Sequence, residues 1–235
     1  MIEFDEDAKK MVLKLVYYGP ALSGKTTNLL TLHEQLAPQG RGDLMVLDTQ
    51  DDRTIFFDLL PFFLRAPSGL QIKVKVFTVP GQVRHDATRK AVLQRADGVV
   101  FVADSQPAEA ANNMASFENL EKNLSLVGLD IGRIPLVVQF NKRDLPGIVP
   151  EEDIRRVWGP TGIPVQLASA LKGPGVKGTF MKIAALTYDH LDARWKLRTS
   201  HGLSRDAFLG QLVRSRAVQN KNDSERPKGG HGIGR

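Results

Sequence analysis

The segment Gly19-Pro-Ala-Leu-Ser-Gly-Lys-Thr26 (GPALSGKT) decides the fold, because it spells the G-x4-G-K-[S/T] pattern of a phosphate-binding loop. In such a loop, glycines let backbone N–H groups turn inward around phosphate groups, and the following helix points its positive end at them. The apolar run Met11–Tyr18 precedes the segment, and Thr26–Leu36 continues it as a helix that ends before Pro38. A strand, this loop and a helix in that order argue against a chance match.

Short apolar runs alternate with longer segments of helical period along most of the chain, which is typical of a mostly parallel sheet with helices around it. Besides Met11–Tyr18, the expected strands are 43–47, 55–64, 71–79, 98–103, 135–140 and 163–168, and the expected helices are 26–36, 108–126, 151–158 and 176–195. Gly98–Ala103 (GVVFVA) is nearly all apolar, as in a central strand buried on both faces. The sequence therefore predicts the α/β class, as a P-loop NTPase with a mostly parallel central sheet flanked by helices.

The 235 residues are 42% hydrophobic and 25% charged, as in a globular protein of one domain with an appendage. The net charge of +6 is uneven, because residues 193–235 carry seven positive charges in excess and the rest of the chain one negative charge in excess. We expect a nucleotide-binding domain over 1–195 and a basic C-terminal extension over 196–235. Within the extension, 204–218 has the pattern of one short helix, and the charged, Gly-rich residues after Asn220 are expected to be disordered.

Composition also bears on partners and location. The nearly neutral body argues against a broad nucleic-acid-binding face, whereas the basic extension is compatible with a contact to anionic lipid or with a solvated tail. No run reaches the ~18 to 20 apolar residues that span a bilayer, and the acidic start MIEFDEDAKK fits neither a secretory signal nor a transit peptide. Because the chain has no cysteine, disulfides and cysteine lipidation are excluded, and we expect a cytoplasmic protein.

A second motif, Asn141-Lys-Arg-Asp144, follows an expected strand with the N-K-x-D spacing of guanine readers. The Asp144 carboxylate can accept hydrogen bonds from guanine N1–H and from the 2-amino group, whereas adenine would leave that charge unpaired. An ATP-using P-loop protein is the alternative that Asp144 opposes. We expect the Asn141 side chain to bond the purine and to brace the phosphate loop. In Ser169-Ala170, after the last expected strand, the Ala170 N–H is expected to meet the guanine carbonyl.

The stretches GPALSGKT, TVPGQ, NKRD and SA, in this order and spacing, resemble the Ras-like small GTPases. Longer stretches (KLVYYGP, TTNL, DRTIFFDLLP, FTVPGQVRHDATRK, DGVVFVADSQ and IPLVVQFNKRDLP) are similar to one bacterial branch, the mutual gliding-motility protein A (MglA) family. The resemblance covers about residues 11–192. It implies a Ras-like GTPase fold over 1–195, GTP or GDP with Mg²⁺ as ligands, slow GTP hydrolysis and a role in cell polarity or motility, with the protein concentrated at a cell pole. It also implies a dimeric roadblock-domain protein (MglB) that docks on the switch face as the activating partner.

The residues expected to hold the nucleotide come from the motifs above and from two switch loops. They are Gly19, Leu22, Ser23, Gly24, Lys25, Thr26, Thr27, Thr54, Gly81, Asn141, Lys142, Asp144, Ser169 and Ala170. Lys25 is expected to reach the β- and γ-phosphate oxygens, and the Thr26 hydroxyl to ligate Mg²⁺.

One position departs from most P-loop GTPases, in which an acidic side chain ends the strand three residues before Gly81 and helps hold magnesium. Thr78 stands there, within TVPGQ, which is normal for the resembled branch. The residue at that strand end often touches the metal only through a water, and a threonine hydroxyl accepts this hydrogen bond more weakly than a carboxylate. With Thr26, Thr54 and phosphate oxygens as the other ligands, we expect weakened rather than abolished magnesium affinity.

Four switch residues are expected to act in hydrolysis or in sensing the γ-phosphate. The Gly81 N–H would sense the γ-phosphate, Gln82 would orient the attacking water, and Thr54 would ligate Mg²⁺ only in the triphosphate state. Arg53 would act with Lys25 on the developing charge, as an arginine finger supplied by the chain itself. The alternative for Arg53 is a solvated charge in an acidic loop.

Two classes of function remain at this stage. The first is a hydrolysing switch, and the second is a non-hydrolysing, nucleotide-bound interaction module that acts through its basic tail. The presence of both Gln82 and Arg53 favours the switch. The apolar run 56–63 between the switch loops is expected to be mostly core, with a part exposed to partners in one nucleotide state.

Overall fold

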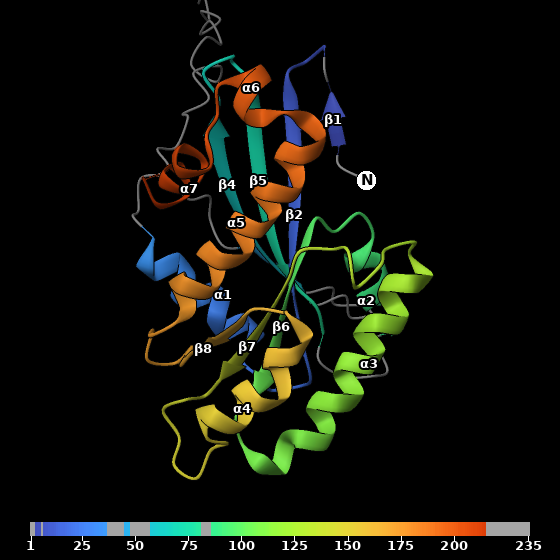
Figure 1. Ribbon diagram of the computed structural model, residues 1–235, viewed down its shortest axis with the longest axis vertical. Helices are drawn as coiled ribbons and strands as arrows, with labels where there is room; N and C mark the ends of the chain where they lie inside the picture. The colour runs from blue at the N-terminus through green and yellow to red at the C-terminus, as the bar shows by residue number, and fades with distance from the viewer. Residues whose placement is uncertain (1–2, 6, 37–44, 48–56, 81–85, 215–235) are drawn as a thin grey trace, which may run out of the picture.

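The computed structural model describes residues 3–5, 7–36, 45–47, 57–80 and 86–214 (Figure 1). Its elements are β1 Glu3–Asp5, β2 Lys10–Tyr18, α1 Lys25–Gln35, β3 Met45–Leu47, β4 Phe57–Arg65, β5 Gln71–Thr78, α2 Asp86–Leu93, β6 Gly98–Asp104, α3 Ala110–Leu126, β7 Leu136–Asn141, α4 Glu151–Trp158, β8 Val165–Leu167, α5 Val176–Trp195, α6 Leu197–His201 and α7 Arg205–Arg214. Short 3-10 turns, Pro107–Glu109 and Gly159–Thr161, precede α3 and follow α4.

The strands form one sheet in the order β3-β4-β5-β2-β6-β7-β8, with β1 paired to β2. β2 lies in the middle and runs parallel to both β5 and β6, and β7 and β8 continue the parallel part. β3 and β4 add an antiparallel edge. The predicted α/β class with a mostly parallel central sheet is confirmed.

The strands form where the side-chain pattern matches a sheet face. In β5, Ile72, Val74 and Val76 are buried, whereas Lys73 and Lys75 are only half-buried, because successive side chains point to opposite faces. All residues of β6 are buried, as expected of a central strand covered on both faces.

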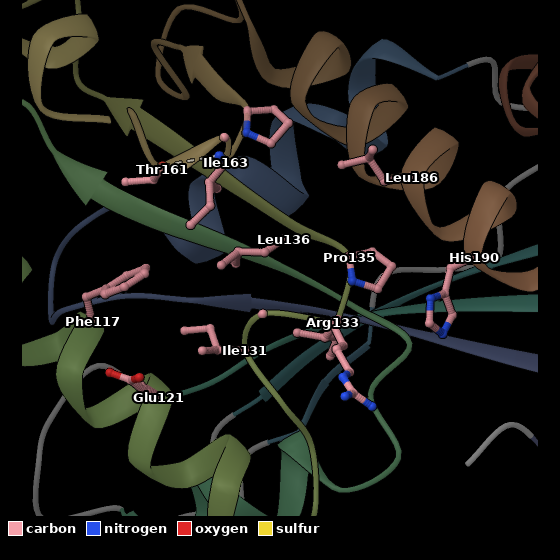
Figure 2. A pocket seen from close by; sticks show the side chains of 14 residues that line it. Phe117, Glu121, Ile131, Arg133, Pro135, Leu136, Thr161, Ile163, Leu186 and His190 are labelled. Carbon is pink, nitrogen blue, oxygen red and sulfur yellow. Dashed lines mark hydrogen bonds between the residues drawn. The ribbon is translucent and has the colours of Figure 1, made fainter. Parts of the chain in front are cut away.

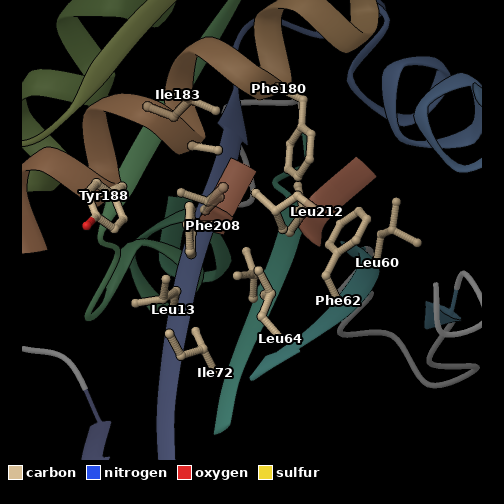
Figure 3. Close-up of a cluster of buried hydrophobic side chains, with 14 of the residues drawn as sticks. Leu13, Leu60, Phe62, Leu64, Ile72, Phe180, Ile183, Tyr188, Phe208 and Leu212 are labelled. Atoms are coloured by element: carbon tan, nitrogen blue, oxygen red, sulfur yellow. The ribbon is translucent and has the colours of Figure 1, made fainter. Parts of the chain in front are cut away.

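Helices cover the sheet on both faces and enclose two apolar cores (Figure 1). Beneath α1, α5 and α7, the first core gathers side chains such as Leu13, Phe62 and Phe208 (Figure 3). The second core lies beneath α2, α3 and α4 and includes Phe101 and Leu120. Each large apolar side chain that leaves water stabilises the fold by about 1.5–3 kcal/mol. The two cores therefore fix the helices against the sheet, and the loops at the strand ends connect elements whose positions are set.

The C-terminal helices return to the sheet. In α7, Phe208 and Leu212 are each 1% exposed and belong to the first core. The Gln211 side chain pairs with the backbone of Arg65 at the end of β4, accepting from its N–H at 3.0 Å and donating to its carbonyl at 3.1 Å. The helix predicted within 204–218 is present as α7, and residues 215–235 lie outside the described residues. The division of the chain after residue 195 stays a prediction.

Three of the described strands and helices were not predicted. β1 extends the sheet beside the first residues of β2, α2 follows β5, and the short helix α6 follows α5. The sequence of α2, DATRKAVL, is only eight residues long and its first five residues are mostly polar, so the few apolar residues at its end, of which Val92 and Leu93 are buried in the second core, do not indicate a helix by their spacing. In the part of the chain that the structure describes, none of the helices has both the length and the apolar character to cross a bilayer.

Candidate functional site

The motif residues meet at one edge of the sheet, because parallel strands end on the same side. The register pairs Tyr17 of β2 with Thr78 of β5, and Asp104 of β6 with Asn141 of β7. The phosphate loop follows β2 directly. In open α/β sheets, ligands bind at this carboxyl edge.

Two glycines shape the phosphate loop by letting other groups approach its backbone. At Gly19 (φ +147°), an added Cβ would lie 2.2 Å from the Val102 carbonyl oxygen, so the loop rests on β6. At Gly24 (φ +93°), an added Cβ would lie 2.3 Å from Asn141 Nδ2. Both distances are steric clashes for an added Cβ, and the positive φ at each position also favours glycine.

Positive charge collects at this loop. Lys25 is 7% exposed, and its Nζ donates to the carbonyls of Gly19 at 3.0 Å and Pro20 at 2.6 Å. Helix α1 begins at Lys25, so its free N–H groups and its dipole lie at the same place. Thr26 is exposed in the first turn, and Leu22, also exposed, has a left-handed backbone with φ +60°. An ammonium group beside a helix N-terminus favours an anionic ligand.

Asn141 joins the second motif to the phosphate loop. Its side chain is buried, and Nδ2 donates to the Ser23 carbonyl at 2.8 Å while Oδ1 accepts from the Ala170 N–H at 2.8 Å. The predicted brace is therefore present. The Ala170 N–H, predicted to meet a guanine carbonyl, donates to Asn141 in this structure, and its contact with a base stays a prediction.

Asp144 is exposed to solvent and held by one strong contact. The Ser169 hydroxyl donates to Asp144 Oδ1 at 2.5 Å, and this hydrogen bond lowers the pKa of the carboxyl, helped by the charges of Lys172 and Lys142. A cavity of about 340 Å³ lies beside it, lined by Arg143, Asp144, Leu167, Ala168, Ser169, Lys172 and Pro174. The carboxylate is therefore ionised and fixed in direction, as an acceptor of paired N–H groups must be.

Two further polar residues support the site, and sequence reasoning missed both. Asp104, buried at the end of β6, forms an ion pair with Lys142 (Nζ–Oδ2 2.5 Å). Gln139, within β7, donates from Nε2 to Asn28 Oδ1 and to Thr179 Oγ1, each at 2.9 Å. A polar residue inside an otherwise apolar strand was the available signal, because buried polar groups need partners.

The metal and switch residues are only partly described. Thr78 is 3% exposed at the end of β5, beside the strand that leads into the phosphate loop. Arg53, Thr54, Gly81 and Gln82 lie outside the described residues, so their predicted roles stay predictions.

The described residues fit a nucleotide. The Gly-containing loop, the Lys25 ammonium and the start of α1 suit phosphate groups. The ionised carboxylate of Asp144 suits the donors of a purine base. The Thr26 hydroxyl, in the first turn of α1, suits Mg²⁺. This ion prefers oxygen ligands and is commonly bound by protein side chains together with the phosphate oxygens of a substrate.

A separate cavity of about 580 Å³ lies near the amino-terminal ends of β7 and β8, away from this edge (Figure 2). It is lined by Phe117, Glu121, Ile131, Gly132, Arg133, Ile134, Pro135, Leu136, Thr161, Gly162, Ile163, Pro164, Leu186 and His190. None of the motif residues contributes to it, so it is not part of the candidate nucleotide site.

The sheet order and the phosphate loop at its carboxyl edge define a P-loop protein with the Ras-like GTPase fold. No family model matches the chain. The mutual gliding-motility protein MglA of Myxococcus xanthus (strain DK1622) is 45% identical over 184 residues, which are 78% of this chain and 94% of that protein. The chain belongs to the MglA family of small GTPases.

Proposed function

We propose that this protein is a molecular switch that binds GTP and GDP with Mg²⁺ and slowly hydrolyses GTP to GDP and phosphate. The observation that carries the proposal is the Asn141 brace, because one buried side chain joins the N-K-x-D motif to the phosphate loop through Ser23. A base at Asp144 and phosphates at Gly24 would thereby be held at a set separation. A nucleoside phosphate requires such a fixed separation, because its base and its phosphates are joined covalently through the ribose.

Guanine is the base that this arrangement favours. An ionised Asp144, directed by Ser169, accepts two parallel hydrogen bonds from N1–H and the 2-amino group of guanine. Adenine carries an acceptor at N1 and no 2-amino group, so the carboxylate would face a lone pair. Lys142, held by Asp104, adds positive charge at the same loop.

At the phosphates, Lys25 would exchange its two loop carbonyls for β- and γ-phosphate oxygens. Thr26, Thr54 and, through a water, Thr78 would hold Mg²⁺. When bound, Mg²⁺ supplies positive charge to the phosphate oxygens. Thr78 lies buried at the end of β5, the strand beside the one that leads into the phosphate loop.

In hydrolysis, the oxygen of a water forms a bond to the γ-phosphorus while the bond from that phosphorus to the bridging oxygen of GDP breaks. The proton of the water passes to the released phosphate. Gln82 would orient the water, the Gly81 N–H would sense the γ-phosphate, and Arg53 would stabilise the charge that develops. Turnover without a partner is expected to be slow, on the order of 10⁻⁴ to 10⁻² per second for this mechanistic class.

Family membership supports the proposed cellular role. The relative is named for gliding motility, and we extend to this chain a role in motility or cell polarity, in the cytoplasm and concentrated at a cell pole. A roadblock-domain protein like MglB is the proposed activating partner, together with effectors that dock on the switch face. Contact between the basic tail and a membrane is compatible with the composition of residues 193–235.

The experiment is to denature the purified protein and identify the released nucleotide, then to follow GTP added to nucleotide-free protein. Guanine nucleotide, with GDP accumulating over time, is the expected result. Bound GTP that is never hydrolysed would favour the alternative, an interaction module that acts through its tail. Release of adenine nucleotide would contradict the assignment of Asp144 as a guanine reader.

A further inference from the structure

Arg89 of α2 is the largest fully buried side chain among the described residues, at 1% exposure. A guanidinium group is costly to bury unless its N–H groups are satisfied. Its Nε donates to the Pro80 carbonyl at 2.9 Å, and one terminal nitrogen donates to Asn119 Oδ1 at 2.7 Å. The guanidinium carbon also lies 5.5 Å from the centre of the Tyr18 ring, within range of a cation–π contact.

Tyr18 connects this arginine to the phosphate loop. It is the last residue of β2 and immediately precedes Gly19. Its hydroxyl donates to Asn119 Oδ1 at 2.5 Å, the same oxygen that accepts from Arg89, and receives a hydrogen bond from Asn123 Nδ2 at 3.2 Å. Asn119 Oδ1 is therefore shared between the strand that leads into the phosphate loop and helix α2.

Asp86, the first residue of α2, belongs to the same group. Its Oδ1 accepts from Asn119 Nδ2 at 3.1 Å and from Asn123 Nδ2 at 2.7 Å. Pro80 and Asp86 are the described residues on either side of 81–85. Pro80 is held by Arg89, which itself contacts Asn119 on α3, and Asp86 is held by Asn119 and Asn123 of α3. We call Tyr18, Asp86, Arg89, Asn119 and Asn123 the α2–α3 polar cluster.

We infer that Arg89 is a positioning residue for hydrolysis, because it fixes the carbonyl of Pro80, the residue before Gly81, relative to the strand end that leads into the phosphate loop. The inference rests on the proposed function, in which Gly81 and Gln82 act at the γ-phosphate. The Arg89 side chain donates two hydrogen bonds at once, one to the Pro80 carbonyl and one to Asn119 Oδ1. The planar fork of arginine provides both from a fixed geometry, and the single ammonium of lysine does not.

A purely structural role would not require this arrangement. A buried charge contributes little to stability compared with a well-packed apolar side chain of similar volume. The contacts of Arg89 include one with a backbone carbonyl, that of Pro80, one with Asn119, and one with Tyr18, the residue that precedes the phosphate loop. They join two functional segments that are far apart in sequence.

The test compares full-length wild-type protein with Arg89→Lys and Tyr18→Phe. Arg155→Lys is the matched control, since Arg155 lies on α4 with its side chain 76% exposed. Labelled GDP and GTP give the affinities, single-turnover assays give the hydrolysis rate, and thermal unfolding gives the stability. Tyr18→Phe keeps the ring and removes only the hydroxyl, so it decides the matter if Arg89→Lys does not fold.

Arg89→Lys is expected to keep its affinity for GDP and to lose preference for GTP over GDP. Its hydrolysis rate should fall about 10- to 100-fold, the cost of misplacing a reacting group by about an ångström. Tyr18→Phe should show the same pattern more weakly, and Arg155→Lys should match the wild type.

Two outcomes would overturn the inference while leaving the proposed function intact. One is hydrolysis at the wild-type rate by both Arg89→Lys and Tyr18→Phe. The other is an equal loss of GDP and GTP affinity together with a lower unfolding temperature, which is the signature of a merely structural role. If the wild-type protein itself failed to hydrolyse GTP, the proposed function would be wrong, and the inference with it.

Discussion

Single side chains hold the loops of the candidate site against one another. The side-chain amide of Asn141 makes two hydrogen bonds, to the backbone of Ser23 and of Ala170, which lie in two other loops. The hydroxyl of Ser169 fixes the direction of the Asp144 carboxylate. Such hydrogen bonds contribute only about 0.5–1.5 kcal/mol each to stability. Their larger effect is on position, because a nucleotide must meet its base and phosphate contacts together.

Ser169 is predicted to set the lowest pH at which GDP binds, because it acts on the pKa of Asp144. Its hydroxyl lowers the pKa of Asp144 by stabilising the charged carboxylate, so the acceptor persists as pH falls and is lost only below the usual range of an aspartate. Ser169→Ala should raise that pKa and move the acid loss of GDP affinity to higher pH. A titration of GDP affinity downward from neutral pH checks this, and coincident curves for the two proteins would contradict it.

Thr78 is predicted to set how tightly magnesium is held. A carboxylate at the end of β5 would accept a metal-bound water more strongly than the hydroxyl does, since a charged acceptor makes the stronger hydrogen bond. Thr78→Asp should therefore lower the magnesium concentration needed to slow nucleotide release. Titrating Mg²⁺ against GDP release is the measurement, with Thr161→Asp, at an exposed position, as control. Identical curves for Thr78→Asp and wild type would argue against a role of Thr78 near the metal.

At the scale of elements, the site forms because strand ends and helix starts coincide. β2 ends at Tyr18, and α1 begins at Lys25 after a left-handed Gly24. The side chain of Asn141, at the end of β7, passes over that glycine. The junction of α1 and β7 is thus as much a part of the phosphate loop as its own residues are.

Gly24→Ala tests this junction. The new methyl group would meet Asn141 Nδ2 at 2.3 Å, in addition to the strain of a left-handed backbone. Gly128→Ala is the control, since Gly128 also has positive φ (+75°) but no atom within 4 Å of an added Cβ. Both variants should lose about 1–2 kcal/mol of stability from strain, and only Gly24→Ala should lose most of its affinity for GDP. Calorimetry measures the GDP affinity and thermal unfolding measures the stability, so the two effects can be separated. Equal GDP affinities of the two variants would contradict the role of the contact between Asn141 and Gly24.

At the scale of the whole molecule, the two faces of the sheet carry different tasks. α2 and α3 cover one face and, together with Tyr18 of β2, form the α2–α3 polar cluster. α1, α5 and α7 cover the other, where Phe208 and Leu212 complete the core and Gln211 pairs with Arg65. The last described helix is therefore expected to act on stability and not on nucleotide chemistry.

Leu212→Ala should lower the free energy of unfolding by about 2–5 kcal/mol, because it leaves a cavity in the first core. Its affinity for GDP at a temperature where it remains folded should equal that of the wild type. Gln211→Ala should cost less, about 0.5–1.5 kcal/mol for each lost hydrogen bond. Denaturant unfolding measures both, and an unchanged stability of Leu212→Ala would show that α7 does not contribute to the core.

Much of the fold could be predicted from local patterns. The helices Glu151–Trp158 and Val176–Trp195 have the predicted bounds, and the buried strand at 98–103 is present as β6. α2 was not predicted, since its buried apolar residues, Val92 and Leu93, lie together at its end, and the contacts of Arg89 depend on partners outside the helix. Asp104 and Gln139 escaped notice for a related reason, because their partners lie on other elements.

The sequence by itself determined the phosphate loop, the N-K-x-D motif, most strands and helices, and the resemblance to the MglA family. These depend on neighbouring residues, whose spacing and chemistry are readable without a fold. Only the tertiary structure decided that Asn141 passes over Gly24, that Ser169 directs Asp144 and that Arg89 joins Pro80 to Tyr18. Such contacts depend on which strands become neighbours, and strand order follows from burying two cores at once, not from any single segment.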